Sequence, residues 1–458
     1  MSIITDRRSF LFGASVAGFG IFAQGRRGWA RGVGPNETLN IACIGVGGKG
    51  KSDTGHAARQ GRIVALCDID QIRLDEMAAN HKEAKKYNDF RELLHELDSR
   101  IDAVVVSTPD HTHAAAAVTA MRLGKHVYCQ KPLAHSVWEA RLMRETARQK
   151  GVCTQMGNQG TAEPGFRRGA ELVRSGAIGE VREVHIWTNR PFKYWKQSPD
   201  IVARPTETPP VPKHVHWDLF LGTAPERPYN PVYHPHNWRG WWDFGTGSLG
   251  DMACHTANLT FMALQLGLPV RVSAQSGEIN SETYPAWATI TYEFPARGDQ
   301  PPVKVTWYEG AKKGDRNLPN RRLFPDSGFQ PSDSGSLLIG SKWRMYSPND
   351  YGAVQMLWPA GEYKDLKIPE RMLPRIEGAH GSDDGQKLEW VQAIRAGKPS
   401  LALSNFDYAS NLTESMLLGN VAVRSGQAID YNPETGEITG SSSASQYLKP
   451  YFRKGWEI

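Results

Sequence analysis

The chain has 458 residues, of which 40% are apolar and 22% are charged, and its formal net charge is +6. This length exceeds one ordinary hydrophobic core, so we expect two domains. The composition is that of a globular protein, and the mild positive charge forms no basic block or stripe, which argues against a nucleic-acid-binding protein.

The first residues read as a targeting segment rather than as part of the fold. A twin arginine, Arg7-Arg8, precedes a weakly apolar, Gly/Ala-rich run to Ala23, and two more arginines stand before Ala30. This order is typical of a twin-arginine export signal. We predict a signal peptide over residues 1–30, cleaved after Ala23 or Ala30, and a periplasmic or other extracytoplasmic location. The apolar run is shorter than the roughly 20 residues of a membrane span, and we expect no stable span elsewhere.

A glycine-rich turn follows the first candidate buried strand, residues 41–44. Its glycines match the G-x-G-x-x-G pattern of dinucleotide-binding folds, and they are Gly45, Gly47, Gly48 and Gly50. Gly45 makes the tight turn, Gly47 lets a pyrophosphate approach the backbone, and Gly50 lets the next helix pack close to the strand. The N-terminus of that helix attracts the phosphate charge.

A second candidate strand, Arg62–Cys67, ends at Asp68. An acid about 20 residues past the glycines, at the end of a strand, is placed to accept the ribose hydroxyls of a dinucleotide. Its charge would repel a 2′-phosphate, so the sequence favours NAD over NADP. The alternative is that Asp68 only caps the turn before Asp70.

Candidate helices and strands then alternate with short connections, which predicts a parallel, doubly wound sheet. We expect helices over 71–86 and 114–123 and strands over 103–106 and 126–129. Ligands of such sheets bind at the carboxyl ends of the strands. The candidate cofactor-binding residues at these ends are Ser107, Thr108, Pro109, His111, His113, Gln130 and Lys131.

Two stretches carry a resemblance to a known family. V-V-V-S-T-P-D-H-T-H-A and G-K-H-V-Y-C-Q-K-P-L-A resemble the Gfo/Idh/MocA family, which contains glucose–fructose oxidoreductase and inositol dehydrogenases. The family has a common Glu-Lys-Pro tripeptide, and this chain has Gln130-Lys131-Pro132. The lysine is kept, but an amide that cannot carry charge replaces the acid. The resemblance also implies a polar residue near the nicotinamide ribose, here Asn158, and a homo-oligomer.

From Asn158 onward the pattern changes to alternating strands, at 181–188, 286–294 and 303–308, with a hairpin over 337–345. We predict an α/β protein with a Rossmann domain over 37–157 and an α+β domain over 158–430, followed by a tail over 431–458. The resemblance implies that the second domain contains one large, open, mixed β-sheet.

A Pro- and aromatic-rich segment with little periodicity spans residues 189–247. A long irregular segment in a compact domain is usually functional, because aromatic rings stack on sugars and polar groups bind their hydroxyls. The alternative is a packing loop or a subunit interface. The candidate substrate residues in and beside this segment are Trp187, Arg190, His216, Trp238, Arg239, Trp241 and Trp242.

Asp251 and His255 are spaced i, i+4 and share one face of a helix that we expect to continue through residue 266. Such a pair can act as a base and its orienting partner. Without a third ligand it predicts no metal site, and the five cysteines show no zinc or disulfide pattern, so we expect buried thiols. The pair resembles the family's D-x-x-x-H helix, which implies that Lys131, Asp251 and His255 are catalytic.

These features predict an NAD-dependent oxidoreductase that acts on a CH–OH group of a sugar, polyol or glycoside. Its cofactor would be tightly bound, because an exported enzyme has no obvious NAD pool with which to exchange. His255, with an ordinary pKa near 6.5, is the expected base, and Lys131 would stabilise the alkoxide. The alternative is an NAD-dependent glycosidase that oxidises, eliminates, adds water and re-reduces. A sugar-binding protein without activity is a third interpretation.

Overall fold

The computed structural model describes residues 37–190, 201–325, 328–358 and 369–458. The predicted signal peptide, residues 1–30, lies outside the described residues. No helix within these ranges is both long and apolar enough to cross a membrane. All five cysteines are free and buried, as expected.

The first domain is a six-stranded parallel sheet with strand order β3-β2-β1-β4-β5-β6. Its strands are β1 (Asn40–Ile44), β2 (Arg62–Cys67), β3 (Lys85–Tyr87), β4 (Ala103–Val106), β5 (His126–Cys129) and β6 (Thr154–Met156). Its helices are α2 (Lys49–Ala58), α3 (Gln71–Ala78), α4 (Phe90–Glu96), α5 (Asp110–Arg122) and α6 (Val137–Lys150). Because β1 lies between β2 and β4, the chain reverses its direction of winding there, and the crevice at this point is where doubly wound sheets bind ligands.

Local sequence explains most of this domain. The four residues of β4 are all buried, as expected for a strand covered by helices on both faces. Helix α6 begins with a capping box in which Ser136 and Glu139 exchange hydrogen bonds, and it ends at Gly151, which has a φ of 63°. Both signals are readable from the sequence.

The second domain contains a mixed sheet with ten strands among the described residues, in the order β14-β13-β12-β7-β10-β9-β8-β15-β16, with β11 paired to β10. The strands are β7 (Val181–Trp187), β8 (Arg271–Ser276), β9 (Trp287–Phe294), β10 (Val303–Lys312), β11 (Asp315–Arg316), β12 (Gly335–Gly340), β13 (Arg344–Ser347), β14 (Met356–Trp358), β15 (Ile429–Asn432) and β16 (Glu437–Thr439). The β7–β10 pair is parallel and the other pairs are antiparallel. The predicted fold class, a Rossmann domain followed by a domain with a large mixed sheet, is confirmed.

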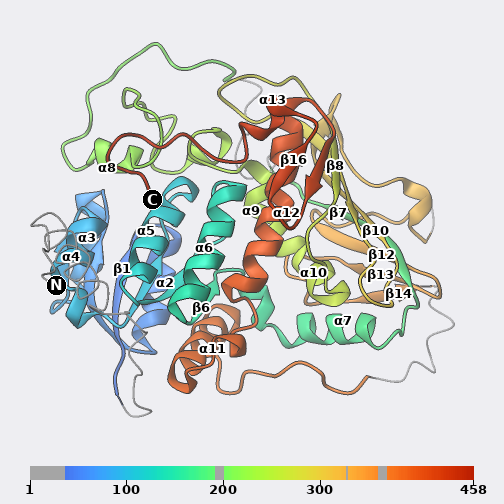
Figure 1. Cartoon of the computed structure of the whole chain (residues 1–458), viewed down its shortest axis with the longest axis horizontal. Coiled ribbons are helices and arrows are strands. Elements are labelled where there is room, and N and C mark those ends of the chain that lie inside the picture. The colour runs from blue at the N-terminus through green and yellow to red at the C-terminus, as the bar shows by residue number, and fades with distance from the viewer. Residues whose placement is uncertain (1–36, 191–200, 326–327, 359–368) are drawn as a thin grey trace, which may run out of the picture.

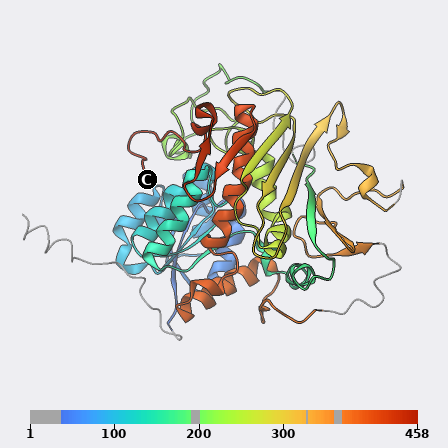
Figure 2. The same ribbon diagram turned by 45° about the vertical axis from the view of Figure 1, so that its right-hand side comes forward.

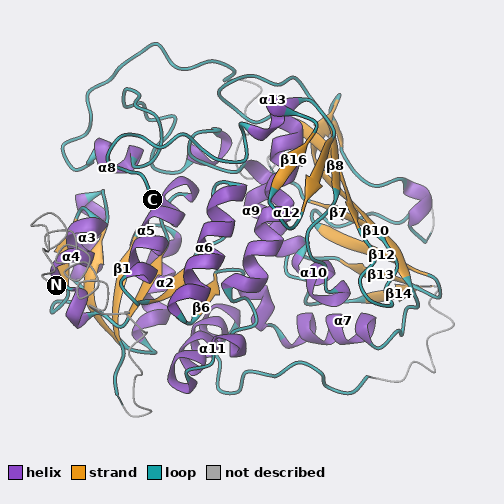
Figure 3. Ribbon diagram, in the orientation of Figure 1, coloured by secondary structure: helices purple, strands orange, loops and turns teal. Residues whose placement is uncertain are grey.

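Helices fill the space between the two sheets (Figures 1 and 2). The remaining helices are α7 (Pro164–Arg174), α8 (Trp217–Leu221), α9 (Gly247–Thr256), α10 (Asn258–Leu264), α11 (Ser382–Ala396), α12 (Phe406–Ser425) and α13 (Ser442–Ser445). Short 3₁₀ turns occur at Asp98–Arg100, Gln159–Ala162, Asn237–Gly240, Arg321–Leu323 and Pro399–Leu401. Helix α12 packs on α6 of the first domain and on α9 and β8 of the second, so it joins the two domains (Figure 3).

Two segments late in the chain return to the first domain. Helix α11 packs on α2, and its Trp390 is buried in the same core as Ile41 and Tyr128. Near the C-terminus, the Trp456 ring lies 6.0 Å from the Phe90 ring. The first domain is therefore completed by residues from late in the chain, of which α11 precedes and Trp456 follows the last strands of the second domain.

Three element boundaries differ from the predictions. The helix expected over 71–86 ends at Ala78, and the short edge strand β3 follows, whose polar sequence carries no strand signal. The helix expected from residue 114 begins at Asp110. The helix expected from Asp251 through residue 266 is divided into α9 and α10, where Asn258 is held by a hydrogen bond from the Tyr408 hydroxyl to its Oδ1.

Candidate functional site

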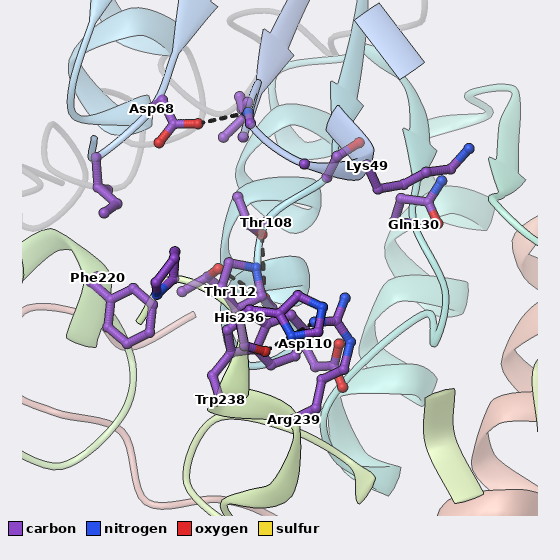
Figure 4. A pocket seen from close by; sticks show the side chains of 18 of the residues that line it. Lys49, Asp68, Thr108, Asp110, Thr112, Gln130, Phe220, His236, Trp238 and Arg239 are labelled. Atoms are coloured by element: carbon purple, nitrogen blue, oxygen red, sulfur yellow. Dashed lines mark hydrogen bonds between the residues drawn. The ribbon is translucent and has the colours of Figure 1, made fainter. Parts of the chain in front are cut away.

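A cavity of about 620 Å³ lies at the carboxyl ends of β1, β2, β4 and β5 and extends to α9. One end carries the glycine loop and Asp68, and the other carries Trp238 and Arg239 (Figure 4). The predicted site residues that line it are Gly45, Gly47, Gly48, Asp68, Ser107, Thr108, Pro109, Gln130, Lys131, Arg190, Trp238, Arg239, Asp251 and His255.

The glycine loop has the geometry that a pyrophosphate requires. Gly45 has a φ of +79°, and a Cβ there would lie 2.7 Å from the backbone of Ser107. A Cβ on Gly50 would lie 1.8 Å from the carbonyl oxygen of Gly45, so Gly50 is buried and lets α2 approach the strand rather than lining the cavity. Gly48 is the N-cap of α2 and has no side chain, so nothing at this position blocks the approach of a phosphate to the helix N-terminus.

Asp68 lines the cavity and also braces the loop. Its Oδ2 accepts hydrogen bonds from the backbone N–H groups of Val46 (2.9 Å) and Gly47 (3.0 Å). Its Oδ1 accepts the N–H of Asp70 (3.0 Å), which was the alternative interpretation of this residue. Burial raises the pKa of the Asp68 carboxyl, against the lowering effect of these N–H donors.

Arg73 is a cavity residue that sequence reasoning missed. Its Cδ would lie 2.4 Å from a Cβ on Gly47, so its side chain lies over the glycine loop. Its Nε is 3.6 Å from Asp70 Oδ2. A positive charge beside Asp68 bears directly on the choice between NAD and NADP.

The three predicted catalytic residues come together at the other side of the cavity. Lys131 Nζ donates to Asp251 Oδ1 at 2.6 Å and to the Asp251 carbonyl oxygen at 2.8 Å. Burial would raise the pKa of Asp251, but the charges of Lys131 and Arg239 hold that pKa well below its ordinary range. Asp251 is therefore an ionised partner for Lys131.

His255, one helical turn after Asp251, is almost fully buried, and its ring packs edge-on against Tyr351 at 5.1 Å. Among the described residues, its Nδ1 has no hydrogen-bond partner. Burial, together with the charge of Lys131, lowers the pKa of His255 well below its ordinary value. The imidazole is therefore neutral at neutral pH, with an unused nitrogen beside the lysine.

The aromatic segment contributes Trp238 and Arg239 to the cavity, besides other lining residues such as Phe220. The 3₁₀ turn at Asn237–Gly240 carries Trp238 and Arg239, and the Arg239 guanidinium lies 4.2 Å from the centre of the Trp238 ring. Arg239 Nε is 3.7 Å from Asp251 Oδ1, which links this group to the three predicted catalytic residues. His236, which sequence reasoning did not select, lies beside them (Figure 4).

The structure places His111 and His113, which we predicted to bind the cofactor, outside the lining of the cavity. His111 Nε2 is 2.8 Å from the Phe220 carbonyl oxygen, and His113 Nδ1 is 2.8 Å from the Pro132 carbonyl oxygen. Both rings are buried outside the lining of the cavity. The reason is that α5 begins at Asp110, so these residues occupy its first turn and face the core, whereas Asp110 and Thr112 line the cavity.

Four predicted substrate residues also lie away from the cavity. Trp187 is fully buried and packs against Tyr346 in the second domain. His216 is exposed on the surface. Trp241 packs edge-on against Tyr233, and Trp242 packs on Tyr284. For His216, Trp241 and Trp242 the cause is that an irregular segment has no periodicity from which side-chain direction can be read. Trp187 is instead the last residue of β7, and its ring packs into the core of the second domain.

Asn158 has a supporting position rather than one on the cavity wall. It is fully buried, its Nδ2 donates to the Cys254 carbonyl oxygen at 3.2 Å, and its Oδ1 accepts the Ser404 hydroxyl at 2.6 Å. Asn158 therefore ties the end of β6 to the helix that carries Asp251 and His255.

Two family models match the chain in succession. One describes the NAD-binding Rossmann fold of an oxidoreductase family and matches residues 39–158, and the other describes that family's C-terminal alpha/beta domain and matches residues 167–301. Together they cover more than half of the chain. The chain belongs to the Gfo/Idh/MocA oxidoreductase family. The predicted family is thus confirmed, and Asp68, Lys131 and Asp251 fall within the matched segments.

Individual Gfo/Idh/MocA relatives resemble this chain over its first part. Inositol 2-dehydrogenase of Salmonella typhimurium is 30% identical over 156 residues, 32% of this chain and 45% of the relative. A glycosyl hydrolase family 109 protein of Solibacter usitatus is 34% identical over 200 residues, 39% of this chain and 44% of the relative. The chain thus spans less than half the length of these curated relatives.

Solved structures of the family share the fold across nearly the whole molecule. An inositol dehydrogenase homologue from Azotobacter vinelandii, complexed with NADH and myo-inositol, has a TM-score of 0.59 and 17% identity. The match covers 86% of this chain and 98% of that one. At this identity the likeness establishes the fold alone.

Proposed function

We propose that this protein is an NAD-dependent oxidoreductase that acts on a CH–OH group of a sugar, polyol or glycoside. The observation that carries the proposal is one continuous cavity with a glycine loop at one end and the Lys131–Asp251–His255 cluster beyond it. Inositol 2-dehydrogenase among the relatives supports an alcohol substrate of this class.

The residues present fit an NAD molecule. The uncapped N-terminus of α2 and the absence of a Cβ at Gly47 suit a pyrophosphate, and the Asp68 carboxylate suits ribose hydroxyls. When bound, NAD accepts a hydride from the carbon that bears the hydroxyl group. His255 lines the cavity, and its buried Nδ1 has no hydrogen-bond partner in the described part of the chain.

The protein's own residues can manage the proton and the charge. His255 is neutral and can take the hydroxyl proton, while the Lys131 ammonium can donate a hydrogen bond to the oxygen as negative charge develops on it. The Lys131 ammonium group donates to both the carboxylate and the carbonyl oxygen of Asp251, so Asp251 holds the lysine side chain in place. This assigns the base to His255 and the electrostatic role to Lys131.

We propose NAD rather than NADP, because the Asp68 carboxylate would repel a 2′-phosphate. Arg73 is the residue that would oppose this preference. Titrations that compare NADH and NADPH binding to the wild type, Asp68→Asn and Arg73→Gln test the assignment. We expect NADH to bind more tightly to the wild type and Asp68→Asn to weaken that preference. Tighter NADPH binding by the wild type would contradict it.

The experiment that tests the proposed reaction is a survey of sugars and polyols for NADH formation, with Lys131→Met as the matched inactive variant. We expect NADH formation by the wild type with at least one hydroxylated substrate and none by the variant. A wild type that binds NAD but oxidises no member of the panel would count against a dehydrogenase.

An NAD-dependent glycosidase is the second candidate, and the similarity to a glycosyl hydrolase family 109 protein supports it. Such an enzyme would return its hydride in every cycle. Release of nitrophenol from nitrophenyl glycosides without net NADH would favour this candidate, whereas net NADH would favour the dehydrogenase.

We also propose that the protein leaves the cytoplasm by the twin-arginine route with its cofactor bound. The support is the order of features around Arg7-Arg8, since that route carries folded proteins. Native mass spectrometry of the exported protein would test both the retained NAD and the expected homo-oligomer. Exported protein without NAD would contradict the proposal that the cofactor stays bound during export.

A further inference from the structure

A buried ion pair is connected to the backbone of Lys131 through the side chain of Gln130. Asp53 on α2 and Lys387 on α11 are both fully buried, and Lys387 Nζ donates to Asp53 Oδ1 at 2.8 Å. The ammonium group also lies 3.5 Å from the centre of the Tyr128 ring. Two buried charges are costly unless they are paired and hydrogen-bonded. The groups that contact this pair must therefore supply hydrogen bonds to it.

The second oxygen of Asp53 faces the strand ends of the site. Asp53 Oδ2 accepts hydrogen bonds from Gln130 Nε2 and from the Ser107 hydroxyl, both at 2.8 Å. Because an ionised carboxylate only accepts, the NH₂ group of Gln130 must face Asp53. The amide oxygen of Gln130 then faces the other way, where it accepts the backbone N–H of Lys131 at 3.2 Å.

Gly157 closes Gln130 in on one side. A Cβ on Gly157 would lie 2.6 Å from the Gln130 amide, so this glycine makes space for the side chain and closes it in. A glutamate at position 130 would place a second carboxylate at hydrogen-bond distance from Asp53. Two carboxylates that face each other would repel unless one of them were protonated, and in this chain the single acid at this point stands at position 53.

The other ionisable groups around Asp53 are either positively charged or neutral. Lys49 Nζ lies 3.6 Å from Asp53 Oδ1 and donates to Asp383 at 2.6 Å. The surrounding groups on the strands are the Cys43 and Cys129 thiols and the Tyr128 hydroxyl, and burial raises the pKa of each, which keeps them neutral. The Lys387 and Lys49 charges lower the pKa of Asp53 despite its burial, so Asp53 is the ionised acid of this group.

We propose that Asp53 and Lys387 are positioning residues for Lys131. They orient Gln130 so that its amide oxygen holds the backbone of the catalytic lysine. The proposal rests on the proposed function only in calling Lys131 catalytic, because the contacts themselves are independent of the reaction.

The test is an exchange of the acid between the two positions, in Asp53→Asn, Gln130→Glu and the double variant Asp53→Asn/Gln130→Glu. In Gln130→Glu, two carboxylates face each other, so we expect kcat to fall about tenfold or more at neutral pH with little change in KM. The loss should shrink as the pH is lowered, because protonation of one acid restores the hydrogen bond. In the double variant, the new amide at position 53 donates to the new carboxylate at position 130, and kcat should return to within about threefold of the wild type.

Two readouts do not depend on activity. Acetic anhydride labelling of Lys131, quantified by mass spectrometry against the exposed Lys51, should rise about threefold or more in each single variant and return to the wild-type rate in the double variant. The midpoint of thermal unfolding should follow the same pattern. If Asp53→Asn does not fold, Asp53→Asn/Lys387→Met removes both buried charges and takes its place in the comparison.

Losses that add in the double variant, or Lys131 labelling that is unchanged in both single variants, would overturn the proposal. A wild type without oxidoreductase activity would instead overturn the proposed function, while labelling and unfolding would still test the pair.

Discussion

At the scale of single residues, the site depends on the protonation states of three buried ionisable side chains. Lys131 and Asp251 form a close pair, and His255 remains neutral beside them. The sequence predicted that these three meet, because the family resemblance carried their roles. It did not predict the low pKa of His255, which arises from burial and from a lysine on a distant part of the chain.

Loss of the lysine should abolish the chemistry while sparing the fold. Lys131→Met keeps the length of the side chain but removes the charge that would stabilise an alkoxide, so we expect kcat to fall by about 100-fold or more. Lys51→Met, at an exposed lysine of the neighbouring helix, is the matched control and should keep wild-type kcat. Steady-state kinetics with NADH binding measured in parallel would check this, and a Lys131→Met enzyme with more than a tenth of the wild-type kcat would contradict it.

The low pKa of His255 should be visible in the pH dependence of the rate. A base must be neutral to accept a proton, and His255 stays neutral until the pH falls to its lowered pKa. We therefore expect kcat/KM to show no acidic limb with a midpoint near 6.5, the ordinary value for histidine. A pH profile with such a limb, absent from a His255→Gln enzyme of low residual activity, would show that the imidazole titrates normally.

At the scale of elements, apolar strands and capped helices could be predicted, and long-range packing could not. The bounds of β2, β4 and β5 follow their apolar runs. Nothing local indicates that α11 packs on α2, or that Gln130 would find an acid on a different helix. The aromatic segment shows the same limit, since Trp238 and Trp242 look alike in sequence but only Trp238 reaches the main cavity.

Two glycines of one helix, α2, should respond in opposite ways to a methyl group. In Gly50→Ala the new Cβ meets the carbonyl oxygen of Gly45 at 1.8 Å, so the helix must move away from the loop and NADH binding should weaken by about tenfold or more. In Gly55→Ala nothing lies within 4 Å, and the unfolding free energy should rise by about 0.5–1 kcal/mol. Urea unfolding and NADH titration of both variants test these two expectations. Equal effects of the two substitutions on NADH binding would contradict the proposal that the glycine loop binds the dinucleotide.

At the scale of the whole molecule, the two domains are joined through helices rather than through a flexible connection. Helix α12 lies between them, and α11 and the C-terminal residues around Trp456 return to the first domain. The cavity takes its walls from both domains, so its geometry depends on how the two domains are joined. We expect the domains to unfold together.

Buried histidines should make the whole molecule sensitive to acid. His126 Nδ1 accepts the backbone N–H of Cys153, which requires an unprotonated nitrogen, and burial lowers the pKa of His126 to about 4. In the unfolded chain the pKa returns to about 6.5, so stability is lost as the pH falls from there toward 4. This residue alone should cost about 2 kcal/mol at pH 5. The unfolding free energy of His126→Gln should fall less steeply between pH 7 and pH 5, and an equal slope in both proteins would contradict the explanation.

The central claim is that the glycine loop and the Lys131 cluster form one site in which a hydroxyl is oxidised beside bound NAD. The most direct measurement is NADH fluorescence after NAD-loaded protein is mixed with a panel of sugars and polyols in a single turnover. We predict NADH formation by the wild type and none by Lys131→Met, with equal NAD binding by both. Equal NADH formation by the two proteins, or NAD binding by neither, would contradict the claim.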